Sequence, residues 1–231
     1  TRYISVTGVQ TCALPICMSD NVQRLLDADA PISDPKQVDT AIFYSISNCQ
    51  SGLAGISFGN FLIKRVVAEL SAEFRNLKTF ATLSPIPGFR RWLDKTLANP
   101  PHDLIGPEEE TSLLSAFPAP NAAGSLARIV AAENWWANPG LRKTAAPVLE
   151  RLCARYLLRE GRGIRALDPV AHFHLSNGAR VERLNMAGDV SDKGARESAT
   201  FMVNYLYDPA KIEEWHEDYA GSGKRNASVA V

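Results

Sequence analysis

The stretch TAIFYSISNCQSGLAGISFGNFLIKRVV, residues 40–67, decides the fold. Its first eight residues, 40–47, alternate in polarity and are rich in β-branched and aromatic side chains, which predicts a β-strand. Glycines then punctuate the chain, and from residue 61 to residue 74 the apolar side chains recur at helical spacing. The stretch therefore predicts a strand, a glycine-rich loop and a helix, in that order.

The rest of the chain continues this mixture of strands and helices. Helix patterns occur at 21–27, 89–97 and 191–198, and Asp168-Pro169 followed by Gly178 marks the start and stop of another helix. Residues 107–160 are mostly helical and predict a helical insertion. Further strands are predicted at 78–83, where two prolines then stop the strand, and at 179–184 and 201–207. The fold class predicted is α/β (α+β).

The first residues do not fit this pattern. Residues 6–16, VTGVQTCALPI, resemble the translation of a sequencing-library adapter rather than part of a fold. A natural β-rich leader is the alternative, but no partner for it is evident nearby. We therefore expect a non-native leader at 1–17, a domain at 18–221 and a disordered tail at 222–231.

Composition limits the possible functions. The chain has 231 residues, 45% of them hydrophobic, which is enough for one sizeable core. Its 25 basic and 25 acidic residues cancel, so no basic field favours nucleic acid or an anionic membrane as a partner. Four cysteines without paired spacing favour neither a zinc site nor a disulfide framework. No apolar run is long enough to span a bilayer and nothing resembles a secretory signal, so we expect a cytoplasmic protein.

The glycine-rich loop is a candidate phosphate-binding site. It lies between a strand and a helix, where glycines let the backbone approach an anion and the helix dipole favours negative charge. The spacing fits neither a Walker loop nor a dinucleotide fingerprint. A tight turn that only packs the helix is the alternative interpretation. The candidate substrate-binding residues are Gln50, Gly52, Leu53, Ala54, Gly55, Ser57 and Lys64.

Ser84 is the first candidate for chemistry, because it follows a predicted strand, where functional side chains are often presented. A hydrolase nucleophile in an elbow would use the N–H of the next residue for its oxyanion hole, and Pro85 has none. Ser84 therefore suits hydrogen bonding or proton transfer better than acyl-enzyme formation, and capping of the next helix is the alternative. His172 and His174 are two residues apart and point to different faces of a helix, so we expect no shared metal.

Several long strings make the chain resemble the C-terminal catalytic part of malonyl-CoA decarboxylases. They are AIFYSISNCQSGLAGISFGNFLIKRVV (41–67), FATLSPIPGFRRWL (80–93), RLCARYLL (151–158), LDPVAHFHLSNGARVERLN (167–185) and MVNYLYD (202–208). The resemblance implies a fold similar to GCN5-related acetyltransferases, with a mixed sheet that admits acyl-CoA. The preceding helical domain that the family uses to form homo-oligomers, and the first strands of the sheet, have no counterpart in the sequence.

The same resemblance names the reactive residues. The family's serine and histidine map onto Ser84 of SPIPGF and His174 of FHLSNG, whereas His172 aligns with asparagine in some relatives. Some relatives carry an acidic residue where this chain has Ser57, so the resemblance does not assign a carboxylate that orients His174. The resemblance implies that malonyl-CoA is the substrate, with coenzyme A bound by the loop residues above and Lys64.

The reaction implied is decarboxylation of malonyl-CoA to acetyl-CoA and carbon dioxide, in fatty acid and malonate metabolism. It needs no separate cofactor and no metal, because the thioester carbonyl accepts the electrons that carbon dioxide leaves behind. Two alternatives stay open: an acyl-CoA acyltransferase on the same scaffold, and a fragment without activity.

Overall fold

The computed structural model describes residues 3–6, 10–13, 18–27, 29, 38–44 and 59–231. Within this part, one large sheet is mixed, with β3 and β4 parallel and the other pairs antiparallel. In order across that sheet its strands are β1 (Tyr3–Val6), β2 (Gln10–Ala13), β3 (Thr40–Tyr44), β4 (Thr79–Thr82), β9 (Met202–Leu206) and β5 (Ser84–Pro85), and β8 (Arg180–Asn185) also pairs with β9. A separate hairpin consists of β6 (Gly161–Arg162) and β7 (Arg165–Ala166).

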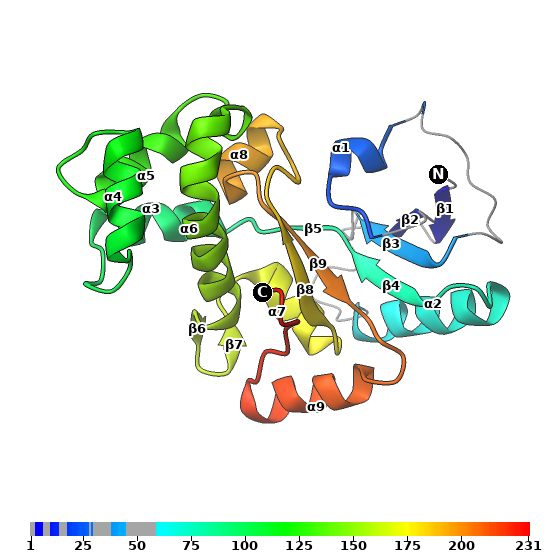
Figure 1. Cartoon of the computed structure of the whole chain (residues 1–231). Helices are drawn as coiled ribbons and strands as arrows, with labels where there is room; N and C mark the ends of the chain where they lie inside the picture. Colours follow the sequence, from blue (N-terminus) through cyan, green and yellow to red (C-terminus); the bar gives the residue numbers. More distant parts are fainter. Residues whose placement is uncertain (1–2, 7–9, 14–17, 28, 30–37, 45–58) are drawn as a thin grey trace.

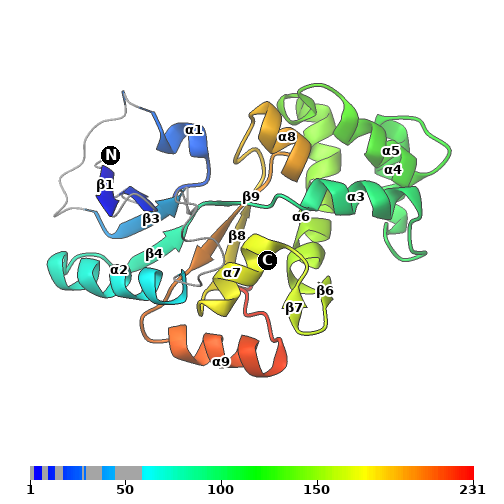
Figure 2. The same ribbon diagram turned by 180° about the vertical axis from the view of Figure 1, so that it is seen from behind.

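Helices flank the sheet and extend beyond one end of it (Figure 1). The helices are α1 (Val22–Leu25), α2 (Gly59–Glu73), α3 (Phe89–Ala98), α4 (Pro107–Ala116), α5 (Ala122–Ala131), η3 (Trp135–Ala137), α6 (Pro139–Leu158), α7 (Pro169–Ser176), α8 (Asp192–Ser198) and α9 (Ile212–Ser222). Both Figure 1 and Figure 2 show α2, α7 and α9 along one side of the sheet and α3 to α6 grouped beyond one end. The predicted fold class, a mixed sheet flanked by helices, is confirmed.

The strand predicted from alternating polarity at residues 40–47 includes β3, and both faces of β3 are buried. Ala41 and Phe43 pack into the main core, whereas Ile42 and Tyr44 pack into a second cluster with Leu25 of α1. Successive side chains of a strand point to opposite faces, so a strand covered on both sides buries every residue.

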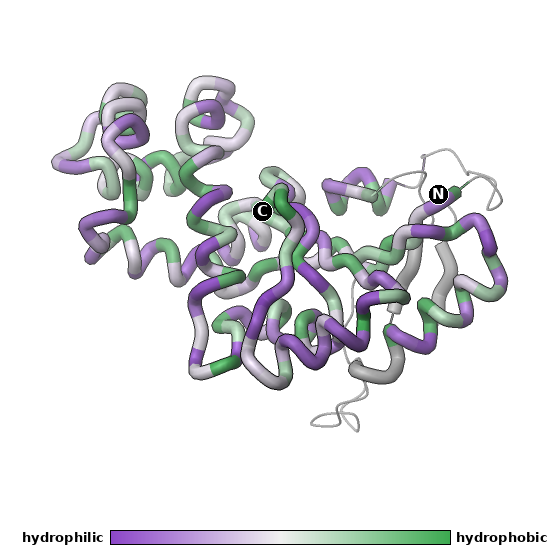
Figure 3. Tube along the Cα trace, turned by 60° about the horizontal axis from the view of Figure 1, so that its bottom comes forward, coloured by the Kyte–Doolittle hydropathy of each residue, from purple (hydrophilic) through white to green (hydrophobic). Residues whose placement is uncertain are grey.

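Figure 3 shows hydrophilic and hydrophobic stretches alternating along the helices, as expected for helices that bury one face. No helix in the described part is long and apolar enough to cross a membrane.

One strand boundary differs from the prediction. The two prolines were expected to stop the strand at residue 83, but Ser84 and Pro85 pair with Val203 and Met202 of β9 as the short strand β5. Pro85 has no N–H to give to a ladder, and it is tolerated here because the pairing lasts only two residues and its side chain is exposed. The pairing fixes Ser84 against the strand in the middle of the sheet.

The two ends of the chain contain structure where the sequence predicted none. Residues 222–231 were expected to be a disordered tail, but the Val181 N–H donates to the Asn226 carbonyl and the Ser228 N–H donates to the Val181 carbonyl, alongside β8. Within residues 1–17, β1 and β2 form an antiparallel pair, and β2 pairs with β3. The non-native origin of that segment stays a prediction.

Gly178 is the stop of α7, as predicted, and its conformation gives a stability test. Gly178 has φ +77°, and a Cβ there would collide with the carbonyl oxygen of Ile212. Gly163 has φ +61° with open space around it, so it is a matched control. We expect Gly163→Ala to cost about 1 kcal/mol for the left-handed backbone alone, and Gly178→Ala to cost about 2 kcal/mol more, through the collision. Urea unfolding of the two variants measures the difference, and equal costs would contradict it.

Candidate active site

The sheet and α7 bring Ser84 and His174 together across 90 residues of sequence. Ser84 lies in β5, just after β4, and His174 lies in the last turn of α7. The Asp168 carboxylate caps this helix by accepting from the N–H groups of Val170 and Ala171. The Ser84 Oγ lies 3.0 Å from the His174 Nε2, so the two residues predicted as the reactive pair are in hydrogen-bond contact.

The pair is buried inside a chain of hydrogen bonds that the sequence did not predict. Ser84 and His174 are 4% and 2% exposed. The Ser84 Oγ donates to the Thr82 Oγ1 at 2.9 Å, and the Thr82 Oγ1 also accepts from the Tyr205 N–H at 3.2 Å. On the other side, the His174 Nδ1 lies 2.8 Å from the Tyr207 hydroxyl. The Ser84 hydroxyl and the His174 imidazole are therefore each in hydrogen-bond contact with one further side chain, Thr82 and Tyr207 respectively.

Tyr207 contacts the His174 Nδ1, the nitrogen that a carboxylate contacts in many serine–histidine sites. Its hydroxyl contacts the Nδ1, and the Tyr205 ring stacks on the imidazole with centroids 4.4 Å apart and planes at 24°. The only sequence signal for these side chains is the aromatic run of residues 201–207, which covers β9 and the residue on either side of it and in which Tyr205 and Tyr207 alternate with Leu206. The imidazole is thus fixed both in its plane and along its Nδ1–Nε2 axis.

The network is uncharged in the absence of substrate. Burial lowers the pKa of His174 to about 3, so the imidazole is neutral near pH 7. Burial also raises the pKa of Tyr207 well above its usual value, so its hydroxyl keeps its proton. A neutral imidazole between two hydroxyl groups can both accept and donate a proton, which suits transfer to a bound molecule.

His172 belongs to different surroundings, as its position on the other side of α7 predicted. Its Nδ1 lies 2.8 Å from the Tyr219 hydroxyl of α9 and 3.3 Å from the Ser176 Oγ. Burial, followed by the charge of Arg165, lowers the pKa of His172. Among the described residues, no three His, Cys, Asp or Glu side chains are grouped so that they could hold a metal ion.

The predicted coenzyme A-binding residues fall largely outside the described part of the chain. Gln50, Gly52, Leu53, Ala54, Gly55 and Ser57 all lie in residues 45–58, which the structure does not describe. Lys64 is described, on α2, and its Nζ lies 2.8 Å from the Glu213 Oε1 of α9. That ion pair lowers the pKa of Glu213. Binding of a phosphate by Lys64 stays a prediction, and it would require the ammonium to leave this carboxylate.

Fold and site together define a class of protein: a mixed α/β domain built around a neutral, buried serine–histidine pair suited to proton transfer. Comparison with known sequences narrows this class. Residues 9–231 match the family model of the malonyl-CoA decarboxylase C-terminal domain. This chain belongs to the malonyl-CoA decarboxylase family.

Individual relatives agree with that assignment. Malonyl-CoA decarboxylase, mitochondrial, from Anser anser anser is 39% identical over 84% of this chain and 40% of its own length, and the Mus musculus protein of the same name is 38% identical over 93% and 45%. The crystal structure of malonyl-CoA decarboxylase from Rhodopseudomonas palustris is 41% identical, with a TM-score of 0.85 over 96% of this chain and 48% of its own. The chain therefore spans about half the length of the relatives that it matches.

Proposed function

We propose that this chain carries the reaction centre for decarboxylation of malonyl-CoA to acetyl-CoA and carbon dioxide. The observation that carries the proposal is the buried contact between the Ser84 Oγ and the His174 Nε2, 3.0 Å, in a member of the malonyl-CoA decarboxylase family. A hydrolase is disfavoured because Pro85, next to the serine, has no N–H to stabilise an oxyanion.

The substrate supplies its own electron sink in this reaction. The bond between the carboxylate carbon and the α-carbon breaks, carbon dioxide leaves, and the electron pair passes into the thioester as an enolate. The protein then has to stabilise that enolate and return one proton to the α-carbon. We propose that backbone N–H groups of strand 40–47 or of the loop around Gln50 bind the enolate oxygen. β3 supports this, because it runs parallel to β4 and so its carboxyl end lies at the edge from which Ser84 follows.

Ser84 and His174 are proposed to hold the malonyl carboxylate and to return the proton. A carboxylate bound beside His174 raises the pKa of the imidazole from its low value, so that the histidine takes up a proton with the substrate. When carbon dioxide leaves, the negative charge moves to the enolate, and the proton passes from the imidazolium to the α-carbon, directly or through the Ser84 hydroxyl. One proton from solvent is consumed in each turnover, as the reaction requires.

The remaining features of the proposal come from the sequence. Coenzyme A would be bound by Gln50, Gly52, Leu53, Ala54, Gly55, Ser57 and Lys64, with no added cofactor or metal. A cytoplasmic location, a role in fatty acid and malonate metabolism, and a homo-oligomer also belong to the proposal. The relatives from Anser anser anser and Mus musculus are named as mitochondrial proteins.

Incubation of the purified chain with malonyl-CoA alone tests the proposal. We expect acetyl-CoA and carbon dioxide in equal amounts, because decarboxylation needs no second substrate. Chromatography of the thioesters and trapping of the released gas measure the two products. A malonylated amine that forms only after an acceptor is added would instead identify an acyltransferase, and no product in either case would overturn the proposed activity of this chain.

A further inference from the structure

A cavity lies beside the serine–histidine pair, and neither Ser84 nor His174 lines it. Its volume is about 720 Å³, and it lies between α3, the end of α6, the β6–β7 hairpin and the start of α7. Pockets for small molecules and cofactors have volumes of this order. Gly88, four residues after Ser84, and His172, two residues before His174, both line it. The cavity therefore shares its walls with the segments that hold the reactive pair.

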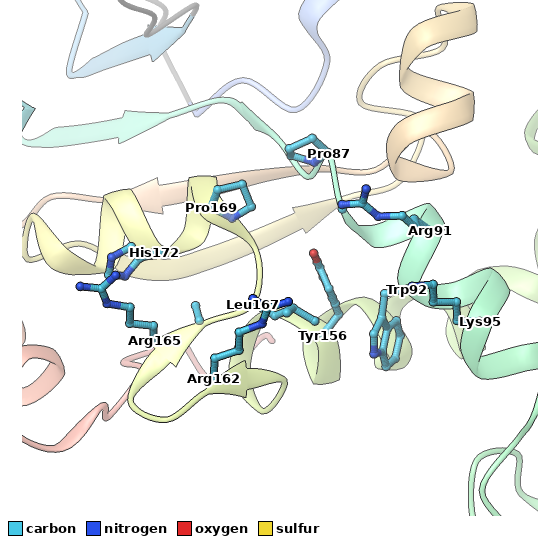
Figure 4. Close-up of a pocket in the computed structure, with 12 residues that line it drawn as sticks. Pro87, Arg91, Trp92, Lys95, Tyr156, Arg162, Arg165, Leu167, Pro169 and His172 are labelled. Atoms are coloured by element: carbon cyan, nitrogen blue, oxygen red, sulfur yellow. The ribbon is translucent and has the colours of Figure 1, made fainter. Parts of the chain in front are cut away.

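Four cationic side chains surround this cavity. Arg91 and Lys95 come from α3, and Arg162 and Arg165 come from the hairpin (Figure 4). Within the part of the chain that the structure describes, none of the four takes part in an ion pair. Four like charges around one hollow repel each other, so a polyanion bound there would relieve the repulsion.

The neighbouring arginines show that carboxylate partners are available on the same elements. Arg90, next to Arg91, pairs with Asp94 at 2.9 Å, and Arg155 of α6 pairs with Glu160 at 3.1 Å. The buried carboxylate nearest the cavity, Asp168, is already engaged by the N–H groups of α7. The four cations that face the hollow therefore lie beside arginines that have a carboxylate partner, while they themselves take part in no ion pair among the described residues.

An aromatic surface completes the cavity. Trp92 is half-buried, and its ring is held against Tyr156, with centroids 5.4 Å apart, and against Phe89, with centroids 6.2 Å apart. A tryptophan fixed in this way beside free cations can stack on a planar base while the cations bind phosphates. Figure 4 shows Trp92 and Tyr156 between the helix cations and the hairpin cations.

We propose that this cationic cavity binds an adenosine polyphosphate, with the phosphates on Arg91, Lys95, Arg162 and Arg165 and the base on Trp92. Two sources share this chemistry: a free adenine nucleotide, and the nucleotide end of coenzyme A. The first adds a ligand to the protein, whereas the second rests on the proposed function and places the nucleotide end of coenzyme A in this cavity instead of at the loop around Gln50. In both cases the ligand lies against the segments that carry Ser84 and His174.

Titration calorimetry with ADP, inorganic pyrophosphate and adenosine tests the proposal on the full chain. We expect ADP and pyrophosphate to bind and adenosine to bind at least tenfold more weakly, with affinity for ADP falling as salt is added. Arg91→Ala and Arg165→Ala should each raise the Kd for ADP at least tenfold. Arg142→Ala, an exposed arginine of α6 away from the cavity, is the matched control and should leave it unchanged. Trp92→Leu should raise the Kd for ADP but leave the Kd for pyrophosphate unchanged, because pyrophosphate has no base to stack on the tryptophan.

Competition with coenzyme A identifies the source of the ligand. If coenzyme A displaces ADP, and if Arg91→Ala and Arg165→Ala also raise the Kd for coenzyme A, the cavity holds the nucleotide end of coenzyme A. If coenzyme A does not displace ADP, the cavity binds free nucleotide. Ser84→Ala should bind ADP as the parent does, so loss of decarboxylation alone would leave this site standing. Absence of ADP binding at millimolar concentration, or equal Kd values for Arg91→Ala, Arg165→Ala and Arg142→Ala, would overturn it.

Discussion

Ser84→Ala is expected to lower the kcat for decarboxylation by roughly 100-fold to 10,000-fold, with little change in the fold. The substitution removes one hydroxyl from a buried position and keeps the backbone of β5, which pairs with β9. It also leaves the His174 Nε2, which now lies 3.0 Å from the Ser84 Oγ, without this partner. Steady-state production of acetyl-CoA from malonyl-CoA measures the effect, and the ratio of kcat values gives the lost transition-state stabilisation.

Thr82→Val distinguishes the role proposed for the Ser84 hydroxyl, which reacts, from that of the Thr82 hydroxyl, which positions it. The Thr82 Oγ1 accepts from Ser84 and from the Tyr205 N–H, but it does not contact His174 in the structure. We expect this variant to lose about tenfold in kcat, much less than Ser84→Ala, because the reacting pair itself is retained. A rate for Ser84→Ala within a few-fold of the parent would remove the serine from the mechanism.

The sequence named the two residues that we propose to react, and it did not indicate the residues that hold them in place. Ser84 and His174 stand in distinctive strings, and the resemblance to a family names them both. Tyr207, by contrast, reaches His174 only because β9, which it follows, lies between β4 and β8, and the pairing of β9 with β4 joins residues more than 100 apart along the chain. No local pattern in the aromatic run of residues 201–207 distinguishes a core tyrosine from one that contacts an imidazole.

Local patterns also decide how well each element could be predicted. β3 and α7 carry strong local signals, namely an alternating strand and an Asp168 cap with a Gly178 stop, and both form where expected, with residues 45–47 of the predicted strand outside the described residues. The chain after α9 is short, shows no helix or strand pattern, and resembles a tail. It is held instead by backbone pairing with Val181 of β8 and by Arg225, whose guanidinium donates to the Leu157 and Glu160 carbonyls. Such tertiary contacts leave no periodicity in the sequence.

His174→Asn is expected to lower kcat as strongly as Ser84→Ala and, in addition, to reduce the sensitivity of the fold to acid. Burial lowers the pKa of His174 to about 3 in the folded chain, whereas an unfolded histidine titrates near 6.5. The unfolded state therefore binds more protons as pH falls through 6.5, and the fold loses stability from there down to about pH 3. Lowering the pH from 8 to 5 should therefore reduce the free energy of unfolding by about 2 kcal/mol through this histidine alone.

Urea unfolding of the parent, His174→Asn and Ser84→Ala at pH 8 and pH 5 measures that contribution. When the pH is lowered from 8 to 5, the free energy of unfolding of the parent and of Ser84→Ala should each fall by about 2 kcal/mol more than that of His174→Asn. The reason is that only the asparagine variant lacks the buried imidazole. All other titrating groups, including Asp168 with its raised pKa, are common to the three proteins and cancel in the difference. Equal losses in all three would mean that His174 takes up its proton over the same pH range in the folded chain as in the unfolded chain. The lowered pKa of His174, on which substrate-linked proton uptake depends, would then be wrong, even if both variants were inactive.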